Sequence, residues 1–174
     1  MDNIAKFYYY GISPFEIEAI YSTLKRFFGA VEEDEQLQDN DNSYVSMIDI
    51  VFPIPFNESF FQLITLEGWF RMKSLIKEMK RRRGNKGIKI FLRFNGIMQE
   101  INSQLLFSLI NKNDRQFEMG LEKIEYMVDI IPVQLDKLPA NTELVEYSYD
   151  EVTHKWKPHI PESNSNVSIN NNIK

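Results

Sequence analysis

Apolar and polar positions at the start of the chain predict a strand followed by a helix. Residues 6–12 hold four consecutive aromatic side chains, which favour a pleated, half-buried strand. Ser13 is followed by Pro14 and, three residues on, by Glu16, which is a capping-box start with proline in the first helical turn. Apolar residues then recur at helical spacing as far as Phe28, so we expect a helix that ends there.

The next part of the chain holds two apolar runs and then a long amphipathic pattern. Residues 44–54 are apolar enough for a central strand. Residues 59–65 are interpreted as a second strand that forms a hairpin with the first, and a helix that begins near Asn57 is the alternative. From Leu66 the apolar positions follow helical spacing until Gly84, with a basic opposite face.

A pair of strands is expected after this helix. Residues 88–94 alternate with the period of two that is typical of a strand. Asn95-Gly96 lies between two apolar runs and favours a type I′ hairpin turn, because both central residues must accept a positive φ. The partner strand is expected to begin at Ile97 and to run toward Ile110.

One more helix and a final hairpin are expected in the C-terminal part. Asn113 with Gln116 is a second capping-box candidate. Helical spacing continues from there until Pro132, which would end the helix. Residues 144–149 and 152–157 have the pattern of the two strands of a hairpin.

These elements predict a single α+β domain over residues 4–158. Its sheet is expected to be mixed or antiparallel, with about five to seven strands packed against three helices. The chain of 174 residues has the length of one domain, and its apolar fraction of 43% excludes wholesale disorder. Residues 30–43 are acidic and are expected to form a mobile loop, and residues 162–174 a disordered polar tail.

The order of elements allows two architectures. Residues 6–95 can be written β-α-β-β-α-β, which is the ferredoxin-like order. Residues 14–131 can be written α-β-β-α-β-β-α instead.

The second string resembles the small α+β fold of the type III secretion chaperones and the related YbjN-like proteins, less one strand. The segments that carry the resemblance are the Phe-Pro-Ile-Pro-Phe run at 52–56, the helix from Leu66, the strand 88–94 with Asn95-Gly96, and the helix after Asn113. Members of that group bind protein segments and perform no chemistry. The resemblance therefore implies an adaptor- or chaperone-like protein.

The residue types that catalysis requires are largely missing. The chain has no cysteine, and no phosphate-loop, dinucleotide-binding, serine-hydrolase or zinc-protease motif is present. The two histidines, His154 and His159, are expected to be structural or at the surface. The segment from Asp39 begins like an EF-hand loop but lacks its glycine and glutamate, and Asp49 is expected at an edge or facing solvent. We therefore expect no enzyme, no cofactor and no metal site.

Neither a membrane span nor a secretory leader is expected. The longest charge-free apolar stretch, residues 101–111, is shorter than the ~20 residues that a membrane helix needs. The first residues lack the basic leader and apolar core of a signal peptide. We therefore expect a soluble, cytoplasmic protein without a membrane partner.

Charge is distributed unevenly along the chain, which has a net charge of −5. Residues 66–99 hold ten basic and two acidic residues, a net charge of +8, whereas residues 1–65 carry a net charge of −8. Positions three and four apart on a helix are neighbours, so these cations can share one face. The candidate interaction residues are Lys73, Lys77, Lys80, Arg81, Arg82, Arg83 and Lys86.

Three interpretations of this basic segment remain open. Cations at a helix C-terminus complement its dipole at ~0.3–1 kcal/mol each, which explains two or three of the ten. The segment can also contact the acidic residues 32–41, within the molecule or across a dimer. In the third interpretation, the segment binds nucleic-acid phosphates. The rest of the chain is acidic and has no recognisable nucleic-acid-binding motif, which argues against this interpretation. We expect a protein partner or self-association, with nucleic-acid association through residues 71–93 as the alternative.

Overall fold

The chain forms three consecutive β-α-β units and a final strand. A computed structural model describes residues 3–38, 40, 43–97, 101–139 and 142–160. The first unit consists of β1 (Ile4–Tyr10), α1 (Pro14–Phe28) and β2 (Ala30–Glu35). The second consists of β3 (Ser46–Phe52), α2 (Glu58–Arg83), the short 3₁₀ helix η1 (Gly84–Lys86) and β4 (Ile88–Ile97). The third consists of β5 (Ile101–Leu109), α3 (Asp114–Glu122), α4 (Met127–Leu135) and β6 (Leu144–Asp150), and β7 (Lys155–His159) follows.

All seven strands belong to one mixed sheet in the order β2-β1-β3-β4-β5-β6-β7. The two strands of each β-α-β unit are parallel neighbours. The contacts β1–β3, β4–β5 and β6–β7 are antiparallel. The prediction of a single α+β domain with a mixed sheet is confirmed. The described residues form four α-helices in place of three, because a turn at residues 123–126 separates α3 from α4.

The ferredoxin-like alternative has the right order of elements but the wrong sheet. The order β-α-β-β-α-β is present from β1 to β4. A split β-α-β unit requires another strand between its two parallel strands. Here β1 lies directly beside β2, and β3 directly beside β4.

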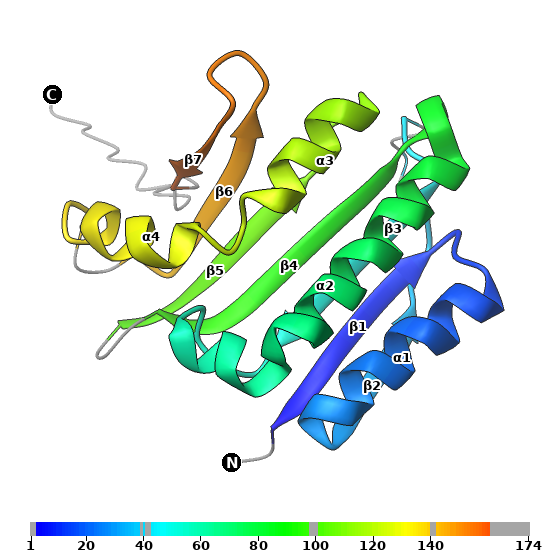
Figure 1. The fold of residues 1–174 in the computed structure, drawn as a ribbon, viewed down its shortest axis with the longest axis horizontal. Coiled ribbons are helices and arrows are strands. Elements are labelled where there is room, and N and C mark those ends of the chain that lie inside the picture. Colours follow the sequence, from blue (N-terminus) through cyan, green and yellow to red (C-terminus); the bar gives the residue numbers. More distant parts are fainter. Residues whose placement is uncertain (1–2, 39, 41–42, 98–100, 140–141, 161–174) are drawn as a thin grey trace, which may run out of the picture.

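The α-helices lie on one face of the sheet, and the core fills the space between them (Figure 1). Alternate side chains of the inner strands point into this core, as the buried Ile90 and Leu92 illustrate. An aromatic cluster forms its centre, where the Phe94 ring lies 4.8 Å from that of Phe52 and 4.9 Å from that of Phe60. Such ring pairs add about 0.5–1.5 kcal/mol each beyond the burial of their area.

The helix starts predicted from capping residues are correct. Ser13 is the N-cap of α1, its Oγ accepts a hydrogen bond from the Glu16 backbone N–H at 3.3 Å, and proline occupies the first turn. Asn113 caps α3 in the same way, with 3.1 Å between its Oδ1 and the Gln116 nitrogen. These caps depend on neighbouring residues only, which is why the sequence indicates them.

Residues 59–65 are helical, so their assignment as a strand is wrong and the alternative start near Asn57 is correct. Asn57 caps α2 and accepts a hydrogen bond from the Phe60 N–H. Phe60 and Ile64, four residues apart, are both fully buried on one side of the helix. The helix is interrupted at Thr65 (φ 64°, ψ 160°), whose Oγ1 accepts a hydrogen bond from the Gly68 N–H, so a new helical segment does begin at Leu66.

The acidic loop predicted over residues 30–43 is wrong in its first part. Residues 30–35 form β2, an edge strand that pairs in parallel with β1. Backbone pairing with β1 suffices here, because an edge strand exposed on both faces needs hardly any apolar side chains. Only Val31 packs against the core, and residues 32–35 are exposed.

Asn95-Gly96 does not form the predicted two-residue turn. Asn95 pairs with Gln104 and Ile97 with Ile101, and the register shifts between these two pairs. The positive φ of Gly96 (91°) therefore serves an irregularity within the strand pair. The connection itself falls on residues 98–100, outside the described part of the chain.

Two predictions near the C-terminus also change. Pro132 lies inside α4 and does not end a helix there. The final hairpin is confirmed as β6 and β7, although the second strand begins at Lys155 because residues 151–154 form its turn. The predicted disordered tail at 162–174 lies outside the described residues.

Candidate interaction surface

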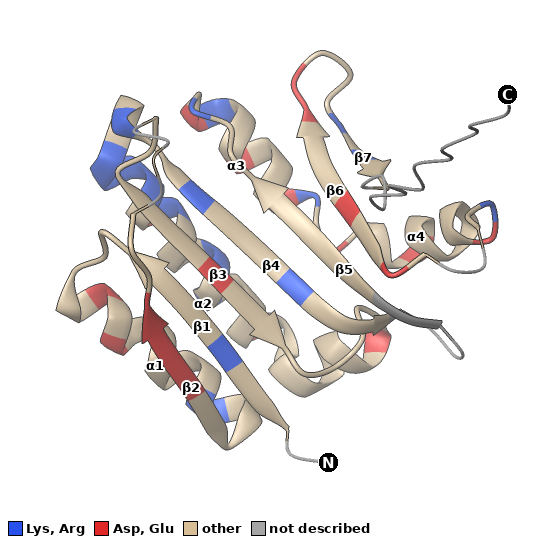
Figure 2. Ribbon diagram, turned by 180° about the vertical axis from the view of Figure 1, so that it is seen from behind, with Lys and Arg blue, Asp and Glu red and all other residues tan. Residues whose placement is uncertain are grey.

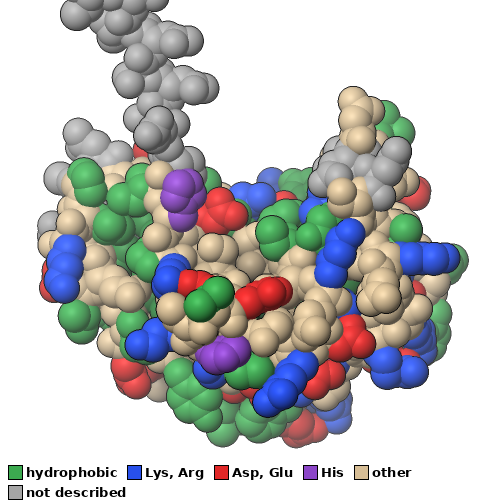
Figure 3. All heavy atoms as spheres, turned by 90° about the horizontal axis from the view of Figure 1, so that it is seen from above, with side chains coloured by type: hydrophobic (Ala, Val, Ile, Leu, Met, Phe, Trp, Pro, Cys, Tyr) green, Lys and Arg blue, Asp and Glu red, His purple; other side chains and the backbone are tan. Residues whose placement is uncertain are grey.

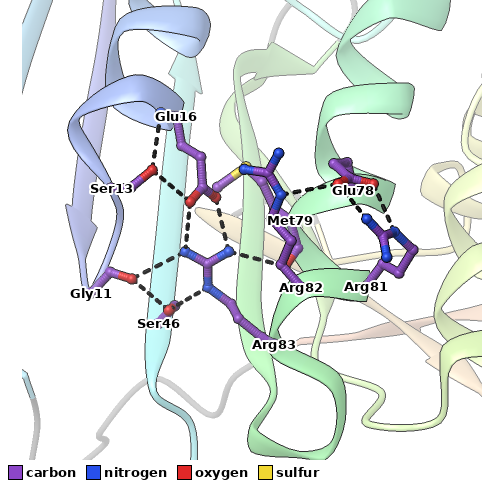
Figure 4. Close-up of polar contacts among 9 residues, drawn as sticks. All are labelled: Gly11, Ser13, Glu16, Ser46, Glu78, Met79, Arg81, Arg82 and Arg83. Atoms are coloured by element: carbon purple, nitrogen blue, oxygen red, sulfur yellow. Dashed lines mark hydrogen bonds and ion pairs between the residues drawn. The ribbon is translucent and has the colours of Figure 1, made fainter.

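The basic end of α2 is tied to α1 by a buried ion pair. Arg83 Nη1 donates to Glu16 Oε2 at 2.8 Å, and Nη2 donates to Oε1 at 3.2 Å (Figure 4). Both side chains are largely buried, with 11% and 5% of their surface exposed. Two parallel bonds of this kind fix the geometry of the pair as well as its charge.

Other polar groups complete the surroundings of this pair (Figure 4). Arg83 Nε donates to Ser46 Oγ at 2.6 Å, and Ser46 Oγ donates to the Gly11 carbonyl at 2.6 Å. Burial alone would raise the pKa of Glu16, but hydrogen bonds from Arg83 and Ser13 and the charge of Arg83 outweigh it and lower that pKa. Arg83 thus joins the start of α1, the start of β3 and the end of α2.

Two lysines of α2 are buried against α3 and the turn that follows it. Lys73 Nζ donates to Glu122 Oε2 at 2.8 Å and to Glu125 Oε1 at 2.7 Å. Burial would lower the pKa of Lys73, but the two carboxylates outweigh it and raise that pKa. Lys80 Nζ donates to Asp114 Oδ1 and to the backbone carbonyl of Lys112.

The remaining predicted residues lie at the surface. Arg81 and Arg82 both donate to Glu78, and these hydrogen bonds lower the pKa of that exposed carboxyl to about 2. Lys77 pairs with Glu122. Of the seven candidates, Lys86 alone forms no ion pair with a described residue.

The structure therefore brings the basic residues together but pairs most of them within the protein. Lys73 and Lys80 are 2% and 1% exposed, so their placement on an accessible surface is corrected. The carboxylates that pair with Lys73, Lys80 and Arg83 lie in α3, in the turn after α3 and in α1. The ion pairs found for the predicted cations do not involve residues 32–35. The net charge of +8 counted along the sequence is consequently not a patch of unpaired cations.

A different surface, which sequence analysis did not single out, is the face of the sheet opposite the helices. No described helix lies over this face (Figure 2). We call it the uncovered sheet face and define it by the outward side chains of adjacent strands. Its apolar members include Tyr8 and Tyr10 of β1, Met47 and Val51 of β3, Phe91 of β4, Leu106 of β5 and Leu144 of β6. The registers place Tyr8, Asp49 and Phe91 in one row across three strands.

Charges of both signs accompany these apolar residues. Arg93 Nε lies 2.8 and 2.9 Å from the two carboxylate oxygens of Asp49, and Lys6 pairs with Glu32 at 3.5 Å. Burial raises the pKa of Asp49, although Arg93 opposes this shift. Among the described residues this face carries five basic and five acidic side chains. They are Lys6, Lys89, Arg93, Lys155 and Lys157 against Glu32, Asp34, Asp49, Glu146 and Asp150.

The uncovered sheet face includes a hollow near its β2 edge. Seen from above, the molecule is hollowed on this side (Figure 3). A cavity of about 400 Å³ is lined by Tyr8, Tyr10, Gln36, Leu37, Met47 and Asp49. Leu37 is 95% exposed beside it, and the Tyr10 hydroxyl is buried without a hydrogen-bond partner among the described residues.

The other residues considered for chemistry are scattered. His154 lies in the turn between β6 and β7, where its Nδ1 is 3.3 Å from Gln116 Oε1, and His159 ends β7. Within the described ranges, no group of three or more histidine, aspartate or glutamate residues could hold a metal ion. None of the helices described is both long and apolar enough to cross a membrane. Comparison of the chain with protein-family models, curated proteins and solved structures found no significant match.

Proposed function

We propose that this chain is a non-catalytic, cytoplasmic protein-interaction domain, adaptor- or chaperone-like, that binds a protein partner through its uncovered sheet face. The observation that carries the proposal is a seven-stranded sheet whose described helices cover one face only, as Figure 2 shows. The strand registers place aromatic and aliphatic side chains on the other face. Tyr8, Met47, Val51 and Phe91 are half-buried there, whereas Tyr10 and Leu106 are buried. Adjacent apolar side chains that stay partly open to solvent mark interaction sites on folded proteins. A second copy of the chain is one form that the partner can take.

The dimensions of this face suit a protein partner. Seven strands spaced ~4.8 Å apart, each of about seven residues, span roughly 30 Å by 20 Å, an area on the order of 600 Å². A standard interface buries about 800 Å² on each partner. The face together with its rim is therefore large enough for one side of a specific complex.

The charge of this face favours protein over nucleic acid. Phosphate neutralisation requires unpaired lysine and arginine, and it supplies most of the non-specific affinity for nucleic acid. The uncovered sheet face carries equal numbers of basic and acidic residues, and Arg93 is engaged by Asp49. The cations of α2 are likewise paired, so the α2 segment offers nucleic acid no concentrated patch of unpaired cations among the described residues.

A site-specific photocrosslinker tests the proposal. p-Benzoylphenylalanine placed at Phe91, on the uncovered sheet face, is irradiated in a lysate of the native cells, and the adducts are identified by mass spectrometry. The matched control carries the same group at Phe15, which is 73% exposed on α1. We expect one dominant protein adduct, or a dimer of this chain, at position 91 only.

The purified adduct partner must then bind the unmodified protein. Nucleic-acid adducts at position 91, or the same adducts from both positions, would contradict the proposal.

A further inference from the structure

A second hollow lies on another part of the molecule, where α4, the turn before it and the β6–β7 hairpin all contribute lining residues. Its volume is about 660 Å³, within the range of roughly 300–1,000 Å³ that small-molecule sites occupy. Met127 and Trp156, each 4% exposed, are its most deeply buried lining residues. Tyr126 and Ile130, four residues apart and so on one side of the helix, line it while staying exposed.

Two lysines lie at one end of this groove. Lys123 and Lys155 both line it, and Lys123 Nζ donates to the backbone carbonyl of His154 at 2.8 Å, which places this ammonium group beside the start of β7. Neither lysine forms an ion pair with a carboxylate in the described ranges. They differ in this respect from the cations of α2, which are almost all paired.

The opposite end of the groove is neutral. Gln134 lines that part, and its Oε1 accepts a hydrogen bond from the buried Tyr147 hydroxyl at 2.7 Å. The groove thus has an apolar length along α4 and positive charge at one end only. The nine residues of α4 span roughly 13 Å, which sets the length of the apolar part.

We propose that this groove binds an amphiphilic anion with a single head group. Its acyl or aromatic tail lies along Met127, Ile130 and Trp156, and its carboxylate meets Lys123 and Lys155. The tail removes apolar surface from water, which is the main source of affinity in such pockets. The head group accepts charge-assisted hydrogen bonds from the two lysines, neither of which pairs with a carboxylate in the described ranges. The strand register puts Lys155 at the β7 edge of the uncovered sheet face, so this residue borders both surfaces. The other residues that line the groove lie outside that face, and the site does not depend on the function proposed for it.

Titration calorimetry with three probes of equal tail length tests both parts of the proposal. Dodecanoate carries the anionic head, 1-dodecanol carries none, and dodecylammonium carries the opposite charge. We expect dodecanoate to bind one site per chain, at least about tenfold tighter than dodecanol and with no measurable binding of dodecylammonium. Equal affinity for all three probes, or no binding of dodecanoate at millimolar concentration, would overturn the proposal.

Three variants locate the site. Ile130→Trp fills the groove and should abolish dodecanoate binding, and Lys155→Glu should weaken it about tenfold or more. Lys86→Glu is the control, because Lys86 is exposed, makes no ion pair with a described residue and lies on a different part of the molecule. Thermal melts identify any variant that has lost its fold, and the smaller changes Ile130→Phe and Lys155→Gln then replace it.

Unchanged dodecanoate binding in both groove variants would place the site elsewhere and overturn the proposal. Light scattering on the same samples tests whether the groove is instead filled by a second copy of this chain. A dimer that Ile130→Trp dissociates would assign the groove to self-association and contradict the ligand site.

Discussion

Arg83, the last residue of α2, and Glu16, in the first turn of α1, form a buried two-bond ion pair although 67 residues separate them in the chain. The pair links two helices that lie side by side on the sheet (Figure 1). Lys73 and Lys80 link α2 to α3 and its following turn in the same manner. The basic segment of the sequence therefore holds the helical layer together.

The three consecutive arginines should differ sharply in their effect on stability. Arg83→Ala leaves the Glu16 carboxylate buried and unpaired, so we expect it to reduce the free energy of unfolding by about 3–5 kcal/mol. Arg81→Ala removes an exposed pair with Glu78 and should cost less than ~1 kcal/mol. Urea denaturation measures both changes, and equal losses for the two variants would contradict the assigned roles.

The pair should also make stability depend on pH in the acid range. The pKa of Glu16 is lower in the folded protein than the ordinary value of 4.5. The resulting stabilisation is present above pH 4.5 and is lost as the pH falls through the lower folded pKa. The difference in unfolding free energy between the wild type and Glu16→Gln should thus shrink below pH 4.5. A difference that stays constant from pH 7 to pH 3 would show that the Glu16 charge contributes nothing.

Two buried tyrosines on β6 offer a matched comparison. The Tyr147 hydroxyl donates to Gln134 Oε1 at 2.7 Å, whereas the buried Tyr149 hydroxyl has no partner among the described residues. Tyr147→Phe should therefore reduce stability by about 1 kcal/mol. Tyr149→Phe removes a desolvated polar group and should leave stability unchanged or raise it by up to ~1 kcal/mol. The denaturant midpoints of the two variants measure this difference. A larger loss of stability in Tyr149→Phe than in Tyr147→Phe would contradict the prediction.

Gly11 should tolerate a side chain far less well than Gly29. Both have positive φ, 63° and 69°, so alanine at either position is strained by about 1–2 kcal/mol. A Cβ at Gly11 would also collide with the Val45 carbonyl oxygen, whereas a Cβ at Gly29 has open space. We expect Gly11→Ala to lose roughly 2 kcal/mol more than Gly29→Ala in thermal or chemical unfolding. Similar losses would mean that the backbone at residue 45 moves aside freely.

Elements with a local signal were predictable from the sequence. The caps at Ser13 and Asn113 and the alternation at residues 88–94 specify their own structure, and each is found where it was expected. The helical structure of residues 59–65 was not predictable in this way, because a short apolar run fits a buried strand and a buried helix equally well. Strand β2 carries almost no pattern, since its side chains are mostly exposed on both faces.

The sequence indicates the surfaces of the protein less well than it indicates the helices and strands. The basic cluster was visible, but its carboxylate partners, such as Glu16 and Glu125, lie far away along the chain and meet it only in the folded state. The alternation of Lys89, Phe91 and Arg93 with core residues does mark one outward side of β4. It carries no information on whether a helix covers that side, because this depends on the packing of all three β-α-β units.

The most direct test of the proposed function is the affinity of the purified partner for two matched variants. Phe91→Glu places a charge in the middle of the uncovered sheet face, whereas Phe15→Glu places the same charge on an exposed position of α1. Titration calorimetry should show affinity at least about tenfold weaker for Phe91→Glu, with Phe15→Glu equal to the wild type. Circular dichroism confirms that both variants are folded. Wild-type affinity in Phe91→Glu, or a loss confined to Phe15→Glu, would contradict the account.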